Sequence, residues 1–353
     1  MPAKVSPRVA IVLFNLGGPD RPEAIKPFLL NLFRDPAILR APFFVRPLLA
    51  RRIAAARLAP ATASYMLLGG HSPLLHWTRA QATALEAAVP ELDAKCFVAM
   101  RYWHPFSIQT AREVKDWDPD EIVLLPLYPQ YSTTTTATSL AAWRDASVRT
   151  GLIAPVTTLC CYPDARDFAT AISALLQPTC AEAEQQHPGR IRLLFSAHGL
   201  PEAIVRSGDP YQWQIEQTVR AVLDTWKNHP ADWVICYQSR ATPQKWLEPS
   251  TEQELERAAR DGVAAVVVPI AFVSEHSETL VELDVDYRRF AERLVIPGYY
   301  RVPAPNDDAR FIAALAGLVR HARTVGPGLC SHSGRRICPA GLTGCPLSVV
   351  ADA

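Results

Sequence analysis

Eight short apolar runs constrain the fold of this 353-residue chain more than any other feature. The runs are rich in Val, Ile and Leu, and longer stretches with helical patterning separate them. Such runs suit strands that are covered on both faces, as in the parallel sheets of α/β proteins. They begin at residues 8 (RVAIVLF), 96 (CFVAM), 121 (EIVLLPLY), 154 (APVTTL), 191 (IRLLFSAH), 232 (DWVICYQ), 264 (AAVVVPIAF) and 299 (YYRVPA). Four precede residue 160 and four follow it, so the sequence predicts two α/β domains, each with a four-stranded parallel sheet flanked by helices.

Polar or glycine-bearing segments follow six of these runs. They are residues 15–19 (NLGGP), 101–105 (RYWHP), 128–136 (YPQYSTTTT), 196–201 (SAHGLP), 236–240 (CYQSR) and 274–278 (SEHSE). In open parallel sheets, ligands bind beyond the carboxyl ends of the strands. We therefore expect an active-site cleft between the two domains. The predicted boundaries are an N-terminal domain at 1–159 with a lip segment at 26–75, a C-terminal domain at 160–304, a helix at 305–329 that returns to the first domain, and a Cys-rich tail at 330–353.

Composition and missing motifs exclude several classes of function. The net charge of +1 gives no overall field to attract nucleic acid. The chain contains neither G-x-G-x-x-G nor G-x-x-x-x-G-K-[ST], so we expect no nucleotide cofactor, and it lacks the G-x-S-x-G elbow of serine hydrolases. The apolar run of six residues before Asn15 is too short for a signal peptide or a membrane span. We therefore expect a cytoplasmic protein whose eight cysteines are thiols or metal ligands.

Two predicted strand ends carry histidines, His198 on one and His276, followed by Glu278, on another. Histidine gains and loses its proton near neutral pH and is a common ligand for divalent transition metals. A single histidine at a strand end is more often structural. The combination with Glu278 favours proton transfer or metal binding, and we expect His198 and Glu278 to meet from opposite walls of a shared pocket.

A file of acids begins directly after His276, with Glu278, Glu282 and Asp286 at four-residue spacing. On a helix these carboxylates would share one face, and like charges at this spacing oppose helix formation by a few tenths of a kcal/mol per pair. Asp284 has a partner in Arg288, but the file has no basic partner of its own. It is either a solvated acidic face or a wet conduit that passes cations inward or protons outward.

The segment at 26–57 departs from the α/β pattern, because it carries seven basic residues and the single acid Asp35 among many apolar side chains. Its four prolines disfavour a single long helix through the segment. Apolar residues beside arginines suit a surface that docks on anionic lipid. The other interpretation is a helical hairpin whose apolar face covers the cleft.

Seven motifs together resemble those of the ferrochelatase family over nearly the whole chain. They are NLGGP at 15, LGGHSPL at 68, RYWHP at 101, LYPQYS at 127, FSAHGLP at 195, CYQSR at 236 and SEHSETLVELD at 274. The resemblance implies two Rossmann-like, chelatase-type domains and a lyase of haem biosynthesis that inserts Fe²⁺ into protoporphyrin IX and releases two protons. It implies that His198 and Glu278 are the catalytic residues and the ligands of the substrate iron.

Further site residues come from the same resemblance. His276, Glu282 and Asp286 match a metal or proton path. The residues that match porphyrin contacts are Leu16, Arg101, Tyr102, Tyr128, Ser132, Tyr237 and Gln238. Leu16 is similar to the apolar residue of members that use protoporphyrin. The alternatives are a coproporphyrin III ferrochelatase and a non-catalytic protein that binds a tetrapyrrole or an iron–sulfur cluster. The resemblance leaves open a homodimer and a peripheral contact with the inner membrane.

Three cysteines stand close together in the tail, Cys330, Cys338 and Cys345. Thiols in a Gly/Pro-rich tail suggest a metal or cluster site. The tail resembles that of ferrochelatases with a structural [2Fe–2S] cluster, which implies a fourth ligand, either Cys160 or Cys161. A Cys₃His zinc site that uses His332 is the competing interpretation.

Overall fold

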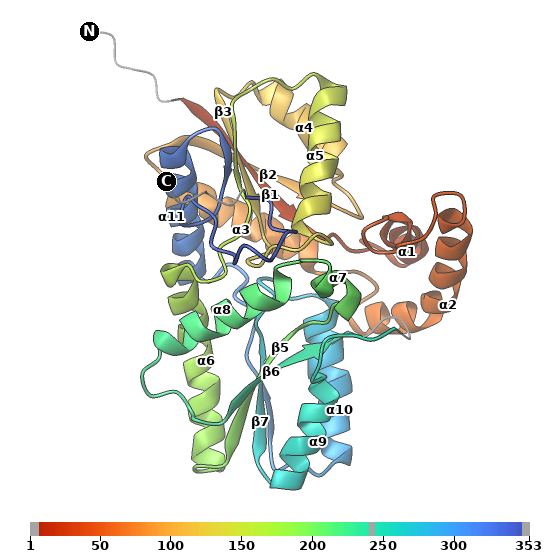
Figure 1. Ribbon diagram of the computed structural model, residues 1–353, viewed down its shortest axis with the longest axis vertical. Helices are drawn as coiled ribbons and strands as arrows, with labels where there is room; N and C mark the ends of the chain where they lie inside the picture. Colours follow the sequence, from red (N-terminus) through yellow and green to blue (C-terminus); the bar gives the residue numbers. More distant parts are fainter. Residues whose placement is uncertain (1–6, 240–243, 348–353) are drawn as a thin grey trace. The chain divides into compact units, whose positions relative to one another are not determined.

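The computed structural model describes residues 7–239 and 244–347, so Arg240 and the last six residues of the predicted Cys-rich tail lie outside the described part. The chain divides into two compact units. Unit 1 comprises Met1–Cys161 and Leu315–Arg335, and unit 2 comprises Tyr162–Ala314 and Arg336–Ala353. Both units contain a parallel sheet, so the predicted α/β class is confirmed (Figure 1).

The sheet of unit 1 has the strand order β2-β1-β3-β4-β9. Its strands are β1 (Arg8–Asn15), β2 (Asp93–Met100), β3 (Glu121–Pro126), β4 (Val156–Leu159) and β9 (Gly328–Cys330). The first four are the apolar runs predicted from the sequence. The fifth strand was not predicted, because β9 begins with Gly328 and contains a single aliphatic residue, Leu329; it pairs with β4 through Leu159 and Cys330.

Helices cover both faces of this sheet, with α4 and α5 on one face and α3 on the other (Figure 1). Phe14 of β1 packs edge-on against Trp143 of α5, with ring centroids 5.8 Å apart. The 3₁₀ and α-helices are η1 (Pro22–Ala24), α1 (Ile25–Arg34), α2 (Arg46–Leu67), α3 (Leu74–Ala88), α4 (Ser107–Trp117), α5 (Thr136–Thr150) and α11 (Ala309–Val325), which begins in unit 2 and continues in unit 1.

The lip segment forms the pair of helices α1 and α2 beside the sheet (Figure 1). Phe28, Leu29 and Phe33 of α1 are buried in their own cluster with Ala50 and Ala54 of α2. Phe43 and Phe44, on the connection between the two helices, are 79% and 72% exposed. The apolar face of α1 therefore packs on α2, whereas the connection presents aromatic side chains to solvent. In the described residues, no helix is long and apolar enough to cross a membrane.

The sheet of unit 2 has the order β6-β5-β7-β8. Its strands are β5 (Ile191–His198), β6 (Trp233–Gln238), β7 (Ala264–Pro269) and β8 (Tyr299–Arg301), as predicted. The helices are α6 (Arg166–Gln186), α7 (Glu202–Arg206), α8 (Tyr211–Asp224), α9 (Thr251–Asp261), the π-helix η2 (Glu278–Tyr287) and α10 (Arg288–Arg293). In Figure 1, α6 and α9 lie on opposite faces of this sheet.

The acidic file lies on η2, whose π-helical turns are wider than those of the expected α-helix. Leu283 and Tyr287 anchor one side of η2 against Val267 of β7 and Leu255 of α9. Burial of these apolar side chains fixes which residues of η2 face the interior and therefore which acids leave solvent.

Candidate active site

The sheet register of unit 2 brings His198, His276 and Glu278 together. His198 is the last residue of β5, and His276 and Glu278 follow the neighbouring strand β7. Ser196 of β5 is opposite Pro269 of β7, and its carbonyl oxygen accepts a hydrogen bond from Ile270 N. Because the two strands are parallel neighbours, the segments that follow them begin at the same sheet edge.

A single carboxylate stands between the two imidazoles. Nε2 of His198 lies 3.6 Å from Oε1 of Glu278, and Nε2 of His276 lies 3.7 Å from Oε2. The expectation that His198 and Glu278 meet is confirmed, and both come from unit 2: His198 ends β5, and Glu278 begins η2, which follows the neighbouring strand β7. The side chains are 37%, 11% and 26% exposed for His198, His276 and Glu278, so His198 is the most open to a ligand.

Main-chain carbonyl groups set the tautomers of both histidines. Nδ1 of His198 lies 2.7 Å from Gly199 O, and Nδ1 of His276 lies 3.1 Å from Ser274 O. A carbonyl oxygen can only accept, so each Nδ1 carries the hydrogen. In the neutral imidazole, the lone pair is then on Nε2, the nitrogen that faces Glu278. Each ring can accept a proton or bind a metal ion at that atom.

Charge from the histidines keeps Glu278 ionised. Burial by itself raises the pKa of this carboxyl, but the positive charge of the His198 imidazolium and the contact with His276 outweigh burial and lower the pKa to about 2. Near neutral pH, Glu278 is therefore an anion and a weak base. It can attract a cation or stabilise a protonated imidazole beside it.

Glu282 has a different environment, although it belongs to the same acidic file. Its carboxylate accepts hydrogen bonds from Ser239 N at 2.8 Å, Ser239 Oγ at 2.5 Å and Gln238 Nε2 at 3.2 Å. Ser239 has a left-handed backbone with φ of 66°, a costly conformation that directs both of its donors at Glu282. Burial and the negative charge of Glu278 raise the pKa of Glu282, so this carboxyl holds a proton more readily than an exposed one.

Asp286, the third acid of the file, is exposed at the surface. Of the three acids, Glu278 and Glu282 are partly buried, and Asp286 faces solvent. The file is therefore not uniformly solvated, and its three carboxylates are not equivalent. As predicted, Asp284 pairs with Arg288, at 3.8 Å.

In unit 1, Arg101 and Tyr102 converge on Asp35, a residue that the sequence singled out only as the lone acid of the basic segment. Arg101 Nη2 lies 2.5 Å from Asp35 Oδ2, and the Tyr102 hydroxyl donates to the same oxygen at 2.9 Å. Tyr102 is 1% exposed, whereas the Arg101 side chain is 25% exposed. Tyr102 can therefore act only by holding Asp35 and Arg101, while Arg101 is accessible.

The other predicted porphyrin contacts are mostly buried. Leu16 is partly buried and packs on the α1–α2 cluster. Tyr128 is partly buried with a buried hydroxyl group, and Ser132 is 1% exposed with its Oγ 2.9 Å from Thr134 Oγ1. In unit 2, Tyr237 is 3% exposed.

Gln238 lies beneath the histidines and braces η2. It is fully buried, accepts a hydrogen bond from Ser196 Oγ at 2.8 Å, and donates to the Glu278 carbonyl oxygen at 3.1 Å as well as to Glu282. The polar groups of Gln238 thus tie β5, β6 and η2 together. Gln238 therefore contributes to the site by holding these three elements in place.

The predicted cluster cysteines divide between the units, with Cys160, Cys161 and Cys330 in unit 1 and Cys338 and Cys345 in unit 2. In unit 1, Cys160 N donates to Cys330 O at 2.7 Å, the Sγ atoms of Cys160 and Cys161 are 3.5 Å apart, and burial together with the charge of Cys161 raises the pKa of Cys330 to about 11. In unit 2, a hydrogen bond from Cys338 lowers the pKa of Cys345 to about 6. Gln214 of α8, which is fully buried, donates to Cys338 Sγ at 3.2 Å.

Among residues 7–239 and 244–347, no three or more His, Cys, Asp or Glu side chains are grouped so as to hold a metal ion. The described cysteines predicted as cluster ligands are among the residues that form no such group. The partial exposure of His198 and Glu278 suits an ion that arrives and leaves as a substrate.

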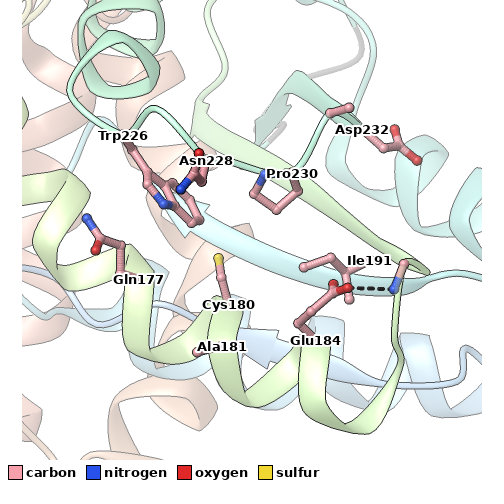
Figure 2. A pocket seen from close by; sticks show the side chains of 11 residues that line it. Gln177, Cys180, Ala181, Glu184, Ile191, Trp226, Asn228, Pro230 and Asp232 are labelled. Atoms are coloured by element: carbon pink, nitrogen blue, oxygen red, sulfur yellow. Dashed lines mark hydrogen bonds between the residues drawn. The ribbon is translucent and has the colours of Figure 1, made fainter.

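A cavity of about 670 Å³ lies at the opposite end of β5 (Figure 2). Ile191, the first residue of β5, lines it with Cys180 and Glu184 of α6 and with Trp226, which follows α8. Glu184 already accepts a hydrogen bond from Gly189 N at 2.6 Å, the dashed line in Figure 2. Since His198 is at the other end of the strand, this cavity is separate from the histidine–carboxylate site.

Comparison with known proteins starts with the fold. SirB from Bacillus subtilis, solved with Fe³⁺, matches with a TM-score of 0.51 at 10% identity, covering 90% of this chain and 95% of that one. A sirohydrochlorin chelatase SirB solved with cobalt matches with a TM-score of 0.50 at 12% identity, covering 89% and 95%. At such low identity, these matches show a chelatase-like fold alone.

Sequence comparison is more specific. The ferrochelatase family model matches residues 8–323. A ferrochelatase of Hyphomonas neptunium is 48% identical, covering 96% of this chain and 94% of the relative, and one of Caulobacter vibrioides is 48% identical, covering 96% and 97%. A ferrochelatase of Phenylobacterium zucineum is 49% identical, covering 95% and 99%. Since the family model spans most of the chain and these relatives match it almost from end to end, the chain belongs to the ferrochelatase family.

Proposed function

We propose that this ferrochelatase, a lyase of haem biosynthesis, inserts Fe²⁺ into protoporphyrin IX and releases two protons. The observation that supports this reaction most is the Glu278 carboxylate between Nε2 of His198 and Nε2 of His276. Metal insertion replaces two pyrrole hydrogens by one divalent ion and needs no oxidant or reductant. A proton acceptor and an anionic group that attracts iron are the two requirements, and the site supplies both.

His198 accepts the pyrrole protons in this proposal. Its hydrogen is on Nδ1, bound to Gly199 O, so the Nε2 lone pair is available, and its side chain is the most exposed of the three. Once His198 is protonated, its positive charge lowers the pKa of Glu278 to about 2, so Glu278 does not take the proton from the imidazolium. It instead attracts Fe²⁺ and stabilises the imidazolium that forms.

His276, Glu282 and Asp286 form the metal or proton path. Glu282 holds a proton readily because burial and Glu278 raise its pKa, and Asp286 at the surface exchanges with solvent. Protons that leave His198 therefore have acceptors in order of increasing access to water. The porphyrin contacts that we propose are Leu16, Arg101, Tyr102, Tyr128 and Ser132 of unit 1 and Tyr237 and Gln238 of unit 2, with Tyr102 and Gln238 acting through the residues they hold.

Substitution of His198 and Glu278 tests the assignment. We expect His198→Ala and Glu278→Gln to fold and to bind protoporphyrin, seen as quenched tryptophan fluorescence, but to lose about 100-fold or more in iron insertion. His187→Ala is the matched control, because His187 stacks on Tyr300 away from the sheet edge that carries the site. Near-normal insertion by His198→Ala would refute its role as the base.

The choice of porphyrin rests on Leu16. An apolar side chain suits the vinyl groups of protoporphyrin IX better than the extra propionates of coproporphyrin III, because burying a carboxylate against leucine is costly. We expect kcat/KM to be higher for protoporphyrin IX. Faster turnover of coproporphyrin III would assign the chain to the other substrate.

We also propose a structural [2Fe–2S] cluster with Cys161, Cys330, Cys338 and Cys345 as ligands. Four thiols are the donor set of such clusters, and a thiol with a pKa of about 6, that of Cys345, is a ready ligand. Cys161 is preferred to Cys160 because its charge acts directly on Cys330. The role of the cluster would be structural, as a cross-link between its ligands, because metal insertion transfers no electrons. Purified protein should contain two iron and two sulfide per chain and show sulfur-to-iron absorption; one tightly bound zinc without colour would favour the Cys₃His site with His332.

A peripheral position on the cytoplasmic face of the inner membrane is the proposal for localisation. The exposed Phe43 and Phe44, followed by Leu48 and the arginines of α2, support it. A homodimer stays a prediction of the resemblance, and light scattering of the purified chain measures it.

A further inference from the structure

A buried ion-pair network lies directly beside the segment that carries His276 and Glu278. Glu275 precedes His276, and its side chain is 7% exposed. Arg301 at the end of β8 is 10% exposed and places Nη1 2.7 Å from Glu275 Oε1 and Nη2 2.7 Å from Asp284 Oδ2 of η2. One guanidinium group therefore joins the segment before Glu278 to the helix that begins at Glu278.

The segment after β8 completes this network. Ala304 N donates to Glu275 Oε1 at 2.9 Å, and Asn306 Oδ1 accepts a hydrogen bond from Glu275 N at 2.8 Å. The carbonyl oxygen of Val273 accepts from Asn306 N at 3.1 Å. Both the backbone and the side chain of Glu275 are thus held by residues 301–306, one residue away from His276.

Stability alone is a weak reason for such a network. Burying three charges costs solvation energy that their attraction repays only when the geometry is good, and apolar residues of similar volume often stabilise a protein as well or better. A planar guanidinium group that binds two carboxylates, by contrast, fixes their direction and spacing. Because the network lies beside the site, we expect its role to be fixing the positions of the neighbouring side chains.

We infer that Arg301 is a positioning residue, which holds the His276–Glu278 segment and the start of η2 at the distance that lets one carboxylate face both imidazoles. This inference rests on the proposed roles of His276 and Glu278 in binding iron and moving protons. Arg301 touches neither imidazole in the described contacts. It acts through Glu275 and Asp284 and sets the orientation of the groups between them.

Loss of Arg301 has a specific expected consequence. Glu275 would keep only its backbone donors, and its uncompensated carboxylate would draw solvent or a cation into the interior beside His276. The carboxylate of Glu278 would then no longer face both Nε2 atoms. The affinity for iron and the insertion step should suffer, whereas porphyrin binding by other residues should not.

Arg288 offers a matched control, because it pairs with the same Asp284, at 3.8 Å, and is 43% exposed, but among the described contacts it makes none with Glu275. The experiment compares Arg301→Gln, Arg301→Lys and Arg288→Gln in steady-state insertion of Fe²⁺ into protoporphyrin, with separate KM values for iron and porphyrin. Rates are expressed per folded chain, measured by near-ultraviolet circular dichroism at the assay temperature. Porphyrin binding is measured by quenching of tryptophan fluorescence.

We expect kcat/KM for iron to fall about 10- to 100-fold in Arg301→Gln, the usual effect of losing a group that orients a metal-binding side chain. The KM for porphyrin should stay within about twofold. Arg301→Lys keeps the charge but cannot bind two carboxylates in a plane, so it should fold and still lose about tenfold. Arg288→Gln should behave like the wild type.

Two results would overturn the inference. One is a folded Arg301→Gln or Arg301→Lys chain with wild-type kinetics for iron; should Arg301→Gln not fold, Arg301→Lys decides. The other is equal losses in Arg301→Lys and Arg288→Gln, which would assign the effect to Asp284 pairing alone. Glu278→Gln, assayed in parallel, separates this inference from the proposed function: an active Glu278→Gln refutes the function, whereas an inactive Glu278→Gln beside an active Arg301→Lys refutes only the role of Arg301.

Discussion

Nε2 of His198 stands 3.6 Å from Oε1 of Glu278, and both residues belong to unit 2. The spacing of base and anion is thus set by the pairing of β5 with β7 and by the first turn of η2. Because strand register is fixed by the hydrophobic pattern of buried strands, the pair is formed as soon as this one sheet folds. The following predictions test the surroundings of this pair.

Glu282 should make stability depend on pH. In the folded chain, burial and Glu278 raise its pKa above the ordinary value of 4.5, so the folded state binds more protons than the unfolded state in the range above 4.5. Stability from this group is therefore present below that value and is lost as pH rises through the folded pKa. The Glu282→Gln variant has no carboxyl group to titrate at this position. Its free energy of unfolding minus that of the wild type should therefore increase as pH rises.

Urea unfolding of both proteins at several pH values from about 4.5 to 8 measures this gain. Asp286→Asn, which removes an exposed carboxyl from the same helix, is the control for loss of one charge. A constant difference between Glu282→Gln and wild type at all pH values would contradict the prediction.

Gly199→Ala should weaken both the fold and the activity. A Cβ at position 199 would lie 2.9 Å from Gln238 O and 3.3 Å from Trp246 Cε3, so β5 and β6 would have to separate at their ends. Overpacking of this kind costs about 1–3 kcal/mol. The shift would also move Gly199 O, the acceptor for His198 Nδ1, so kcat should fall as well.

Thermal and urea unfolding together with insertion kinetics measure the two effects. Gly341→Ala is the matched control, because a Cβ there meets nothing within 4 Å. An unchanged free energy of unfolding in Gly199→Ala would contradict the prediction, because it would show that the ends of β5 and β6 separate without destabilising the fold.

Cys345 should react faster than Cys180 in protein from which metal has been removed. A hydrogen bond from Cys338, opposed by burial and assisted by Leu347 N and Arg336, lowers its pKa to about 6, whereas burial raises the pKa of Cys180 to about 12. Near pH 7, Cys345 is mostly thiolate, the reactive form, so iodoacetamide should modify it on the order of 100-fold faster than Cys180. Mass spectrometry of tryptic peptides over time measures both rates, and Arg336→Gln should slow the reaction at Cys345.

Phe43→Ser with Phe44→Ser should reduce binding to vesicles that contain phosphatidylglycerol. Inserting one phenylalanine into lipid is worth about 1.5–3 kcal/mol, so the double substitution should lower the partition coefficient by about 100-fold or more. Both side chains are more than 70% exposed, so the free energy of unfolding should not change. Ile153→Ser, at a residue that is 94% exposed on the connection between α5 and β4, is the control. Equal sedimentation of the wild type, the double variant and Ile153→Ser with vesicles would show that the two phenylalanines of the lip segment do not contact the membrane.

The sequence predicted β1 to β8 because buried parallel strands read as uninterrupted apolar runs, for example AAVVVP in β7. It missed β9, since this strand, GLC, contains a glycine and a single aliphatic side chain and stands in no longer apolar run. The π-helical form of η2 was also missed, because the acids at 278, 282 and 286 have the same four-residue spacing in either helix type. The strand-end rule brought His198 and Glu278 together correctly, because both follow strands that are parallel neighbours in one sheet.

Partners from distant positions could not be predicted. Arg301 pairs with Glu275 across 26 residues of sequence, and Asp35 reaches Arg101 across 66. No local motif records such contacts, because they depend on which strand ends the sheet order makes neighbours. Ser239 had a signal in CYQSR, but its left-handed backbone and its two bonds to Glu282 follow only from the folded chain.

The hydrogen on Nδ1 of each site histidine is bound by a peptide carbonyl group, Gly199 O for one ring and Ser274 O for the other. Every amino acid contributes the same carbonyl, so mutational drift at neighbouring positions can alter the chemistry around these rings without rotating either of them. The backbone therefore fixes the orientation of the two Nε2 lone pairs. Substitutions of nearby side chains can change which ligands bind without changing this orientation.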